Sequence, residues 1–224
     1  YFNFFYIKKI TRFAMFLKNQ KLTKKIITIL SEAFKSIPAG NYLVKQDSKK
    51  DIRYKKLAKF VYNNALKKKG VYLSSNKEGV AIAYMIDPNN NKKTIHDFIE
   101  SLKFVVSISG ISNAIGILKR QKYIQKQRPK NEKYIYWEVT GINPAYRGHA
   151  SSGFSMGELR DQIYKKAHKE QLSIYTETSI RKNMIVYRRY GFDVCHEWIM
   201  PDKSTLWFMH YDTTKKPLLN QRNN

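Results

Sequence analysis

Residues 137–153 read Trp137-Glu-Val-Thr-Gly-Ile-Asn-Pro-Ala-Tyr-Arg-Gly-His-Ala-Ser-Ser-Gly153, and this stretch decides the fold. Its first half is β-branched and aromatic, and its second half consists of small residues that lead into an amphipathic segment. A strand that runs through such a turn into a helix gathers unpaired backbone N–H groups at the positive end of the helix dipole. Small residues also let a pyrophosphate approach those groups closely. The stretch therefore predicts an anion-binding turn, although it is neither a P-loop nor a Gly-x-Gly-x-x-Gly fingerprint.

Outward from this turn, the hydrophobic periodicity predicts alternating strands and helices. Downstream, the predicted strands are 134–142, 172–176, 192–199 and 205–210, and the predicted helices are 152–169 and 182–189. Upstream, helices are predicted at 23–36, 94–102 and 111–123, and one more helix is predicted between Asp51, which would cap it, and Gly70, which would end it. The predicted strands in this part are 42–44, 71–75 and 80–86. This order predicts an α/β (α+β) sandwich in which helices surround one mixed sheet.

The balance of charge favours anionic partners without pointing to nucleic acid. Lys and Arg number 42 against 17 Asp and Glu, which gives a formal net charge of +25. Such a chain attracts phosphates, nucleic acids and acidic membranes. The basic residues are scattered rather than arranged in a stripe, as a lysine-rich composition alone would produce. The densest basic run, residues 119–133 with Tyr123 and the adjoining Tyr134 for stacking, is the footprint that a nucleic-acid-binding protein would need.

Other features restrict the class of protein. Cys195 is the single cysteine, so no internal disulfide forms, and its place in a predicted strand favours a small core residue. The histidines lack metal-ligand spacing, so no metal is expected. The longest apolar run, Phe104–Leu118, is too short to span a membrane. We expect a cytoplasmic protein with an N-terminal extension (1–20), a single domain (21–212) and a flexible C-terminal tail (213–224).

Two motifs together carry a family resemblance. The acetyl-CoA loop of the GNAT superfamily of N-acetyltransferases reads roughly Val-x-Pro-x-Tyr-Arg/Gln-Gly-x-Gly/Ala-x-Gly. The residues that match it are Ile142, Pro144, Tyr146, Arg147, Gly148 and Ala150, with Ser152 at the place of the last Gly. Residues 177–192 are similar to the Glu-Thr-Ser-Asn-x-x-Asn-x-x-x-Tyr-x-x-x-Gly-Phe of one GNAT branch, with Ile180 in place of the first Asn. The chain thus resembles a GNAT enzyme over about its last third.

The resemblance implies a mostly antiparallel central sheet, flanked by helices and splayed at its central strands. It implies acetyl-CoA as co-substrate, a small-molecule or peptide amine as acceptor and no metal, and it is compatible with a homodimer. The pantetheine arm would pair with the central strand at Gly141 and Ile142. The residues implied in cofactor binding are Gly141, Ile142, Arg147, Gly148, His149, Ala150, Ser151, Ser152, Gly153, Asn183 and Tyr190.

The implied reaction is direct attack of a primary amine on the thioester through a tetrahedral intermediate. Such an amine is protonated near neutral pH, so a base or a water chain must first remove a proton. Glu138 is the candidate base, because alternation along the central strand places Glu138, Thr140 and Ile142 on one face, where burial would raise its pKa. Glu177 is the second candidate. Tyr187 matches the family's proton donor to the departing thiolate.

Alternative interpretations stay open. Ser152 and Ile180 depart from the family pattern, so the chain could bind acyl-CoA with weak or no catalysis. A basic nucleic-acid-binding module is a less favoured alternative. Several residues also have a plainer structural explanation: Glu138 as the partner of a Lys or Arg, Gly141 as a packing glycine and Tyr187 as a core tyrosine. The sequence does not identify the acceptor amine.

Overall fold

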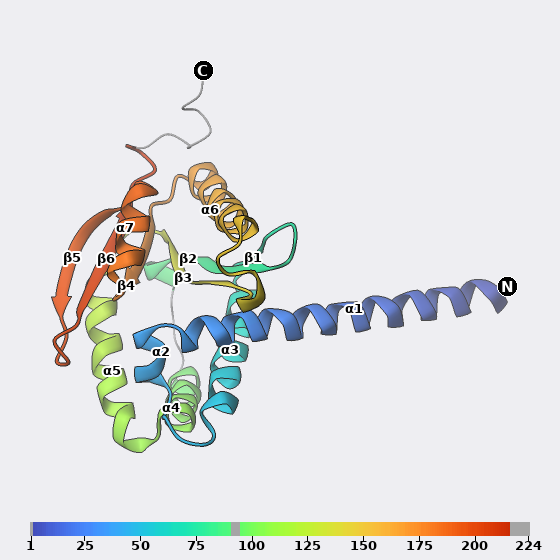
Figure 1. Ribbon diagram of the computed structural model, residues 1–224, viewed down its shortest axis with the longest axis horizontal. Coiled ribbons are helices and arrows are strands. Elements are labelled where there is room, and N and C mark those ends of the chain that lie inside the picture. The colour runs from blue at the N-terminus through green and yellow to red at the C-terminus, as the bar shows by residue number, and fades with distance from the viewer. Residues whose placement is uncertain (1, 91–94, 216–224) are drawn as a thin grey trace.

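A mixed sheet of six strands forms the centre of the computed structural model, which describes residues 2–90 and 95–215, with side chains for residues 19–90 and 100–215. The strand order is β1-β2-β3-β4-β6-β5; β3 and β4 are parallel and every other neighbouring pair is antiparallel (Figure 1). The strands are β1 (Val71–Leu73), β2 (Gly79–Ile86), β3 (Tyr134–Ile142), β4 (Ile174–Thr178), β5 (Asp193–Ile199) and β6 (Thr205–Tyr211). The helices are α1 (Phe2–Lys35), α2 (Pro38–Leu43), α3 (Lys50–Lys67), α4 (Ile95–Ser109), α5 (Ile111–Lys126), α6 (Ala150–Glu170) and α7 (Arg181–Arg189), with short 3-10 turns at Pro88–Asn90 and Pro144–Tyr146.

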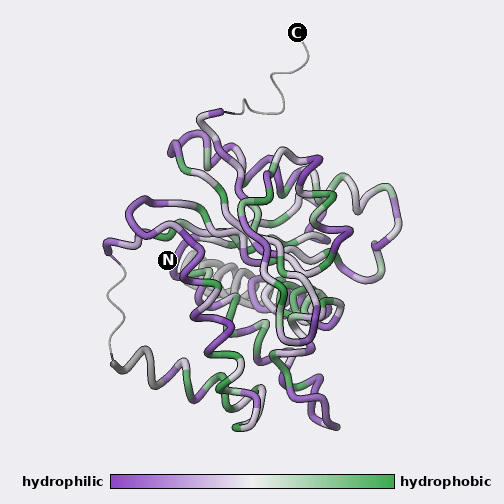
Figure 2. The backbone as a smooth tube through the Cα atoms, turned by 90° about the vertical axis from the view of Figure 1, so that its left-hand side faces the viewer, coloured by the Kyte–Doolittle hydropathy of each residue, from purple (hydrophilic) through white to green (hydrophobic). Residues whose placement is uncertain are grey.

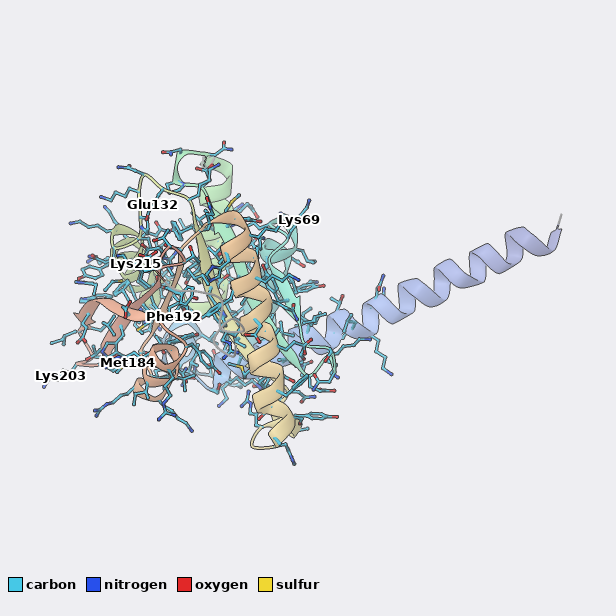
Figure 3. The ribbon with its side chains drawn as sticks, turned by 90° about the horizontal axis from the view of Figure 1, so that it is seen from above. Lys69, Glu132, Met184, Phe192, Lys203 and Lys215 are labelled. Carbon is cyan, nitrogen blue, oxygen red and sulfur yellow. The ribbon has the colours of Figure 1, made fainter. Side chains whose placement is uncertain are left out.

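Helices cover both faces of the sheet. Val80 and Ile82 of β2 face a core built with α1 and α3, whereas Ala81 and Ala83 face a second core built with α6. This alternation follows from the two-residue period of a strand. Hydrophilic stretches gather mostly in the outer turns (Figure 2). Toward its N-terminus, α1 extends away from the rest of the protein (Figure 3).

The predicted elements that lead to the anion-binding turn are confirmed. β3 has the predicted bounds, and the turn after it enters α6 as expected. The predicted helix 23–36 is too short, because α1 is continuous from Phe2 to Lys35 and no break in this helix separates residues 2–20 from residues 21–35. Residue 94 of the predicted helix 94–102 and residues 216–224 of the predicted tail lie outside the described residues.

Two predictions about the first helices are wrong. Residues 42–44 were predicted as a strand, but residues 38–43 form α2, because Pro38 at its first position presets the backbone for a helix. Asp51 does not cap α3: Lys49 occupies the cap position, and no side chain caps the helix. The Asp51 carboxylate instead lies 2.8 Å from Lys35 Nζ, which ties α3 to α1.

Gly70 lies at the predicted helix end, where its N–H donates to the carbonyl oxygen of Ala65 at 2.8 Å, but it is not the left-handed residue. Lys69 adopts the left-handed conformation after α3, with a φ of 52°. A Cβ at Gly70 would lie 2.6 Å from the carbonyl oxygen of Ala83 and 2.6 Å from Cβ of Tyr84. Glycine is therefore needed at this position because the chain passes directly against β2.

The prediction that Cys195 is a core residue is wrong. Cys195 is exposed. It lies on β5, which forms one edge of the sheet and has no buried residue of its own. Its thiol donates to the carbonyl oxygen of Phe208 at 3.4 Å, so it contacts the neighbouring strand without entering the core.

A β-bulge interrupts β3 at Glu138. Two successive residues of β2 pair with Trp137 and Val139, so Glu138 is the extra residue. Trp137 and Val139 consequently belong to cores on opposite faces of the sheet. Trp137 Nε1 also donates to Thr140 Oγ1 at 2.7 Å. The prediction that Glu138, Thr140 and Ile142 share one face by simple alternation is therefore wrong, because the bulge breaks the period.

A buried ion pair fastens the segment after α5 to β4. Arg128 Nε donates to Glu177 Oε1 at 2.8 Å, and a second guanidinium nitrogen donates to Oε2 at 3.1 Å. The two side chains are only 9% and 8% exposed. The guanidinium also lies 3.7 Å from the centroid of the Tyr136 ring. Glu177, the second candidate base, is thus engaged in a structural contact.

Replacing Arg128 with Met should lower the free energy of unfolding by about 3–5 kcal/mol, because the Glu177 carboxylate would stay buried without its counter-charge. Urea denaturation measures this loss. Lys133→Met is the control: its ion pair with Asp87, at 3.1 Å, is more exposed, and its removal should cost less than about 1 kcal/mol. Equal losses from the two variants would contradict the importance of the buried pair.

Candidate active site

β3 and β4 separate soon after their ladder begins. Ile135 pairs with Ile174 and Tyr136 with Tyr175, and from Trp137 onward no further pair joins these two fully described strands. β4 continues instead along β6. The predicted splay of the central strands is confirmed, and it leaves residues 137–142 of β3 with a free edge.

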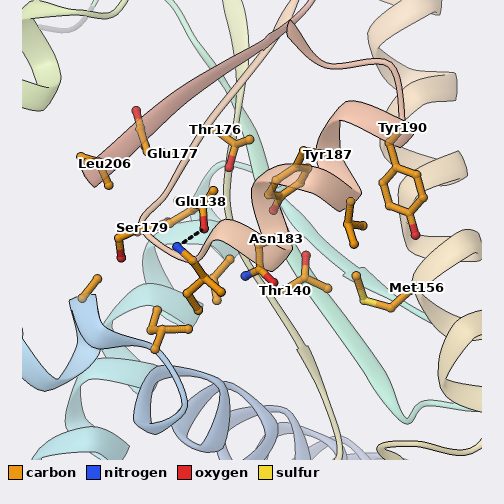
Figure 4. Close-up of a pocket in the computed structure, with 16 residues that line it drawn as sticks. Glu138, Thr140, Met156, Thr176, Glu177, Ser179, Asn183, Tyr187, Tyr190 and Leu206 are labelled. Carbon is orange, nitrogen blue, oxygen red and sulfur yellow. Dashed lines mark hydrogen bonds between the residues drawn. The ribbon is translucent and has the colours of Figure 1, made fainter. Parts of the chain in front are cut away.

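A cavity of about 220 Å³ occupies the gap between the diverging strands (Figure 4). It is lined by Ile37, Ala39, Glu138, Val139, Thr140, Met156, Thr176, Glu177, Thr178, Ser179, Ile180, Asn183, Val186, Tyr187, Tyr190 and Leu206. The cavity therefore brings together both predicted catalytic residues, Glu138 and Tyr187. It also contains two of the predicted cofactor-binding residues, Asn183 and Tyr190.

Glu138 enters the cavity from the bulge in β3. Burial raises the pKa of the Glu138 carboxyl group above its ordinary value. A hydrogen bond from the Tyr84 hydroxyl on β2 opposes this shift, as do the positive charges of Lys68 and Arg128. The net effect is upward, which moves the carboxyl group toward the range in which a base can act near neutral pH.

Tyr187 enters the same cavity from α7 (Figure 4). Its ring packs edge-on against Trp137 and Phe192, with centroid distances of 5.7 and 5.3 Å. Burial raises the pKa of Tyr187 to about 12, although a hydrogen bond with the Thr176 hydroxyl opposes the shift. Tyr187 therefore keeps its proton at neutral pH, in a ring orientation fixed by two aromatic neighbours.

Asn183 and Tyr190 extend the cavity along α7. Asn183 lies one helical turn before Tyr187 and is exposed. Tyr190 ends the helix, and its carbonyl oxygen accepts from the Tyr164 hydroxyl at 2.7 Å. The Arg160 guanidinium lies 4.8 Å from the centroid of the Tyr190 ring. These contacts connect the end of α7 to α6.

The predicted anion-binding turn forms the N-terminus of α6. A 3-10 turn at Pro144–Tyr146 is followed by Gly148, whose φ of 82° suits glycine, and α6 then begins at Ala150. His149 occupies the cap position, and its side chain does not cap the helix. Met156, further along α6, lines the cavity, so the turn lies close to the gap between the strands.

Some backbone N–H groups at the start of α6 are bonded within the protein and others are free. The Ser152 N–H and the Ser152 hydroxyl both donate to the carbonyl of His149, at 2.9 and 2.7 Å. Within the described residues, no acceptor is present for the N–H groups of Gly148, Ala150 and Ser151. Free N–H groups at a helix N-terminus are suited to an anion.

Arg147 covers part of the free edge of β3. Its Nε donates to the carbonyl oxygen of Ile142 at 3.2 Å, while the side chain is otherwise exposed. Ile142 was predicted to offer its backbone to a pantetheine arm. An arm that bonds to this carbonyl would have to displace or share the Arg147 contact.

Gly141 has a packing role. It pairs with Val80 of β2, and a Cβ on Gly141 would lie 3.0 Å from Ala33 Cβ and 3.0 Å from Ile29 Cγ2 in α1. Gly141→Ala should lower the free energy of unfolding by about 1–3 kcal/mol, because α1 would have to move outward. Thermal denaturation tests this, with Gly153→Ala as control, since a Cβ there meets nothing within 4 Å. If Gly141→Ala left the free energy of unfolding unchanged, α1 would be able to move outward at little cost.

Sequence reasoning missed Tyr84 as the partner of Glu138 and Thr176 as the partner of Tyr187. Tyr84 was placed correctly in a strand, and a polar tip on an aromatic residue was the available signal. Tyr84 pairs with Tyr136, and its hydroxyl reaches Glu138 only in the register of β2 against β3 that the bulge produces. No local pattern reveals that register.

Three other predictions about partners can be compared with the described residues. Within the described residues, no helix is long and apolar enough to cross a membrane. They contain no group of His, Cys, Asp and Glu that could hold a metal ion. In the proposed nucleic-acid footprint, Arg128 is committed to Glu177 and Tyr134 is only 3% exposed, so neither faces outward for stacking or phosphate contact.

Comparison with known proteins gives a result at the level of fold. No protein-family model matches the chain, and a search of curated proteins found no match. Among solved structures, the chain is similar to the histone acetyltransferase HPA2 and related acetyltransferase from Corynebacterium glutamicum, with a TM-score of 0.57, 19% identity, and coverage of 84% of this chain and 90% of that chain. It is also similar to the C-terminal condensation domain of Ebony in complex with beta-alanyl-dopamine, with a TM-score of 0.57, 10% identity, and coverage of 84% and 92%. The chain therefore has the fold of the GNAT acetyltransferases, as its two motifs predicted.

Proposed function

We propose that this chain transfers an acetyl group from acetyl-CoA to a primary amine. The observation that carries the proposal is the cavity between the splayed strands, in which a carboxyl group of raised pKa, Glu138, and a protonated tyrosine, Tyr187, face the same space. Amine acylation by a thioester needs one group that accepts a proton and one that donates a proton. The fold of the acetyltransferase from Corynebacterium glutamicum supports the same class of reaction.

The residues around the cavity fit acetyl-CoA. The free edge of β3 offers backbone groups to the amides of a pantetheine arm, and the free N–H groups at the start of α6 suit a pyrophosphate. Gly148 and Gly153 leave open space where side chains would stand. Asn183 and Tyr190 would flank the arm from α7. When bound, acetyl-CoA supplies the thioester that is attacked.

In this proposal each catalytic residue moves one proton. Glu138 accepts a proton from the acceptor amine, whose nitrogen forms the new amide bond. Tyr187 donates its proton to the sulfur as the carbon–sulfur bond breaks and regains a proton from the acylated nitrogen, so the products are an amide, free CoA and the proton that Glu138 passes to solvent. The raised pKa of Glu138 suits the first step, and the raised pKa of Tyr187 keeps the second proton available.

Free thiol release during incubation with acetyl-CoA and a panel of amines tests the proposal. We expect release that depends on both the protein and one class of amine, with the acetylated amine identified by mass spectrometry. Tight binding of acetyl-CoA without transfer to any amine would favour an acyl-CoA-binding protein without catalysis. The alternative of acyl-CoA binding without catalysis rests on Ser152, which stands where the family pattern has Gly and whose hydroxyl already donates to the carbonyl oxygen of His149.

A further inference from the structure

A second cavity, of about 430 Å³, lies between α2, α5 and the turn that joins β5 to β6. Figure 1 shows α5 beside both α2 and the β5–β6 hairpin. The side chains that define this cavity are Tyr42, Lys119, Arg120, Tyr123, Trp198 and Asp202. None of them lines the first cavity. The proton transfers and acetyl-CoA contacts proposed above use none of these residues, so their arrangement needs a separate explanation.

Aromatic rings form the walls of the second cavity. Tyr123 stacks on Trp198 with a centroid distance of 4.1 Å and an interplanar angle of 24°. Tyr42 stands on the α2 side and is 40% exposed. A Cβ on Gly116 of α5 would lie 2.6 Å from the Tyr42 hydroxyl oxygen, so glycine at position 116 makes room for the tyrosine. Such walls suit a planar or bulky apolar group.

Arg120 supplies a cation inside these walls. Its guanidinium lies 5.3 Å from the centroid of the Tyr42 ring, and burial lowers its pKa from the ordinary value, though the group remains charged. Within the described residues no carboxylate oxygen lies within 4 Å of the Arg120 guanidinium, although the more distant charges of Asp202 and Glu177 oppose the downward shift of its pKa. A half-buried guanidinium without a carboxylate in direct hydrogen-bond contact is costly, and a bound anion would offset that cost.

Asp202 attracts Arg120 from a distance but makes no direct contact with its guanidinium. Its Oδ1 accepts from the Ser204 N–H at 3.0 Å and from the Ser204 hydroxyl at 2.6 Å, which holds the carboxylate in its own turn. Lys119 adds a second cation to the lining. The cavity therefore has two positive groups against one carboxylate that is already engaged, which favours an anionic ligand.

We propose that the second cavity binds an aromatic or bulky apolar molecule that carries a carboxylate, with the apolar part between Tyr42 and the Tyr123–Trp198 stack and the carboxylate on Arg120. Arginine recognises carboxylates through two parallel hydrogen bonds, which distinguishes this group from an alcohol of the same shape. This ligand class is independent of whether the chain transfers an acyl group.

The position of the cavity suggests where such a ligand belongs in the reaction. Ala39 of α2 lines the first cavity and Tyr42 of the same helix lines the second. Leu206 of the first and Met200 of the second pack in one small core. Resting on the acetyl transfer proposed above, we assign the second cavity to the far end of the acceptor, which would be an amine with an apolar body and a carboxylate.

Binding of 3-phenylpropionate, followed by isothermal titration calorimetry without acetyl-CoA, tests the site itself. We expect the wild-type protein to bind it at least about tenfold more tightly than the neutral 3-phenylpropanol, because only the acid can pair with Arg120. Arg120→Met should remove this preference. Lys122→Met is the matched control, since it removes a cation from the same helix outside the cavity. Equal binding of the acid and the alcohol by wild type, or an unchanged preference in Arg120→Met, would overturn the proposal.

A second measurement separates this proposal from the proposed function. If amine acetylation is detected, 3-phenylpropionate should inhibit it competitively against the acceptor and not against acetyl-CoA. Acetylation that is insensitive to a bound probe would overturn the assignment to the acceptor. If no amine is acetylated while the preference for the acid still depends on Arg120, the binding site stands and the acetyltransferase proposal fails.

Discussion

Tyr187→Phe should reduce kcat by about 10²-fold or more while the dissociation constant for acetyl-CoA stays nearly unchanged. The substitution removes only the hydroxyl group that would donate a proton to the departing sulfur. The ring would keep its edge-on contacts with Trp137 and Phe192, at 5.7 and 5.3 Å, so the shape of the cavity should persist. Steady-state kinetics of thiol release and calorimetric titration with acetyl-CoA measure the two quantities.

Tyr175→Phe is the control for this result. Tyr175 lies on β4, and its ring stacks on His210 at a centroid distance of 4.5 Å, away from the cavity lining. Removing this hydroxyl should leave kcat unchanged. If Tyr187→Phe weakened acetyl-CoA binding as much as it slowed turnover, Tyr187 would be a binding residue rather than a proton donor.

Glu138→Gln has the second large expected effect, a loss of about 10²- to 10⁴-fold in kcat/KM at neutral pH. A glutamine fits the same space but cannot accept the amine proton. Wild-type activity should fall as the pH drops through the raised pKa of Glu138, because only the carboxylate is a base. The variant should lack this acidic limb. An unchanged pH profile would point to a water chain as the route for the proton.

The same substitution should stabilise the protein at neutral pH. Burial raises the pKa of Glu138 above 4.5 in the folded state, so the folded state binds that proton more tightly than the unfolded state does. The contribution of Glu138 to stability is then lost as the pH rises from the unfolded pKa through the folded pKa. Glu138→Gln should therefore raise Tm relative to wild type at about pH 7.5, and the gain should shrink near about pH 4. A lower Tm at both values would mean that the carboxylate is stabilising.

The sequence by itself determined the elements and their order in the last third of the chain. The bounds of β3, the turn into α6, and the β5–β6 hairpin follow from local signals: alternation, small residues and a polar turn. These signals work because they depend on neighbours within a few residues. Where a local signal was ambiguous, as at residues 42–44, proline chemistry favoured a helix over the predicted strand.

Only the tertiary structure decided how those elements make a site. The bulge at Glu138 arises from the pairing of β3 with β2, and the splay arises because β4 follows β6 instead of β3. The upward pKa shift of Glu138 depends on burial, and Tyr84 and Arg128, which oppose that shift, come from distant parts of the chain. The second cavity likewise joins α2, α5 and the β5–β6 turn. Registers between strands and contacts between helices are long-range properties, so no window of sequence around Trp137 or Arg120 contains them.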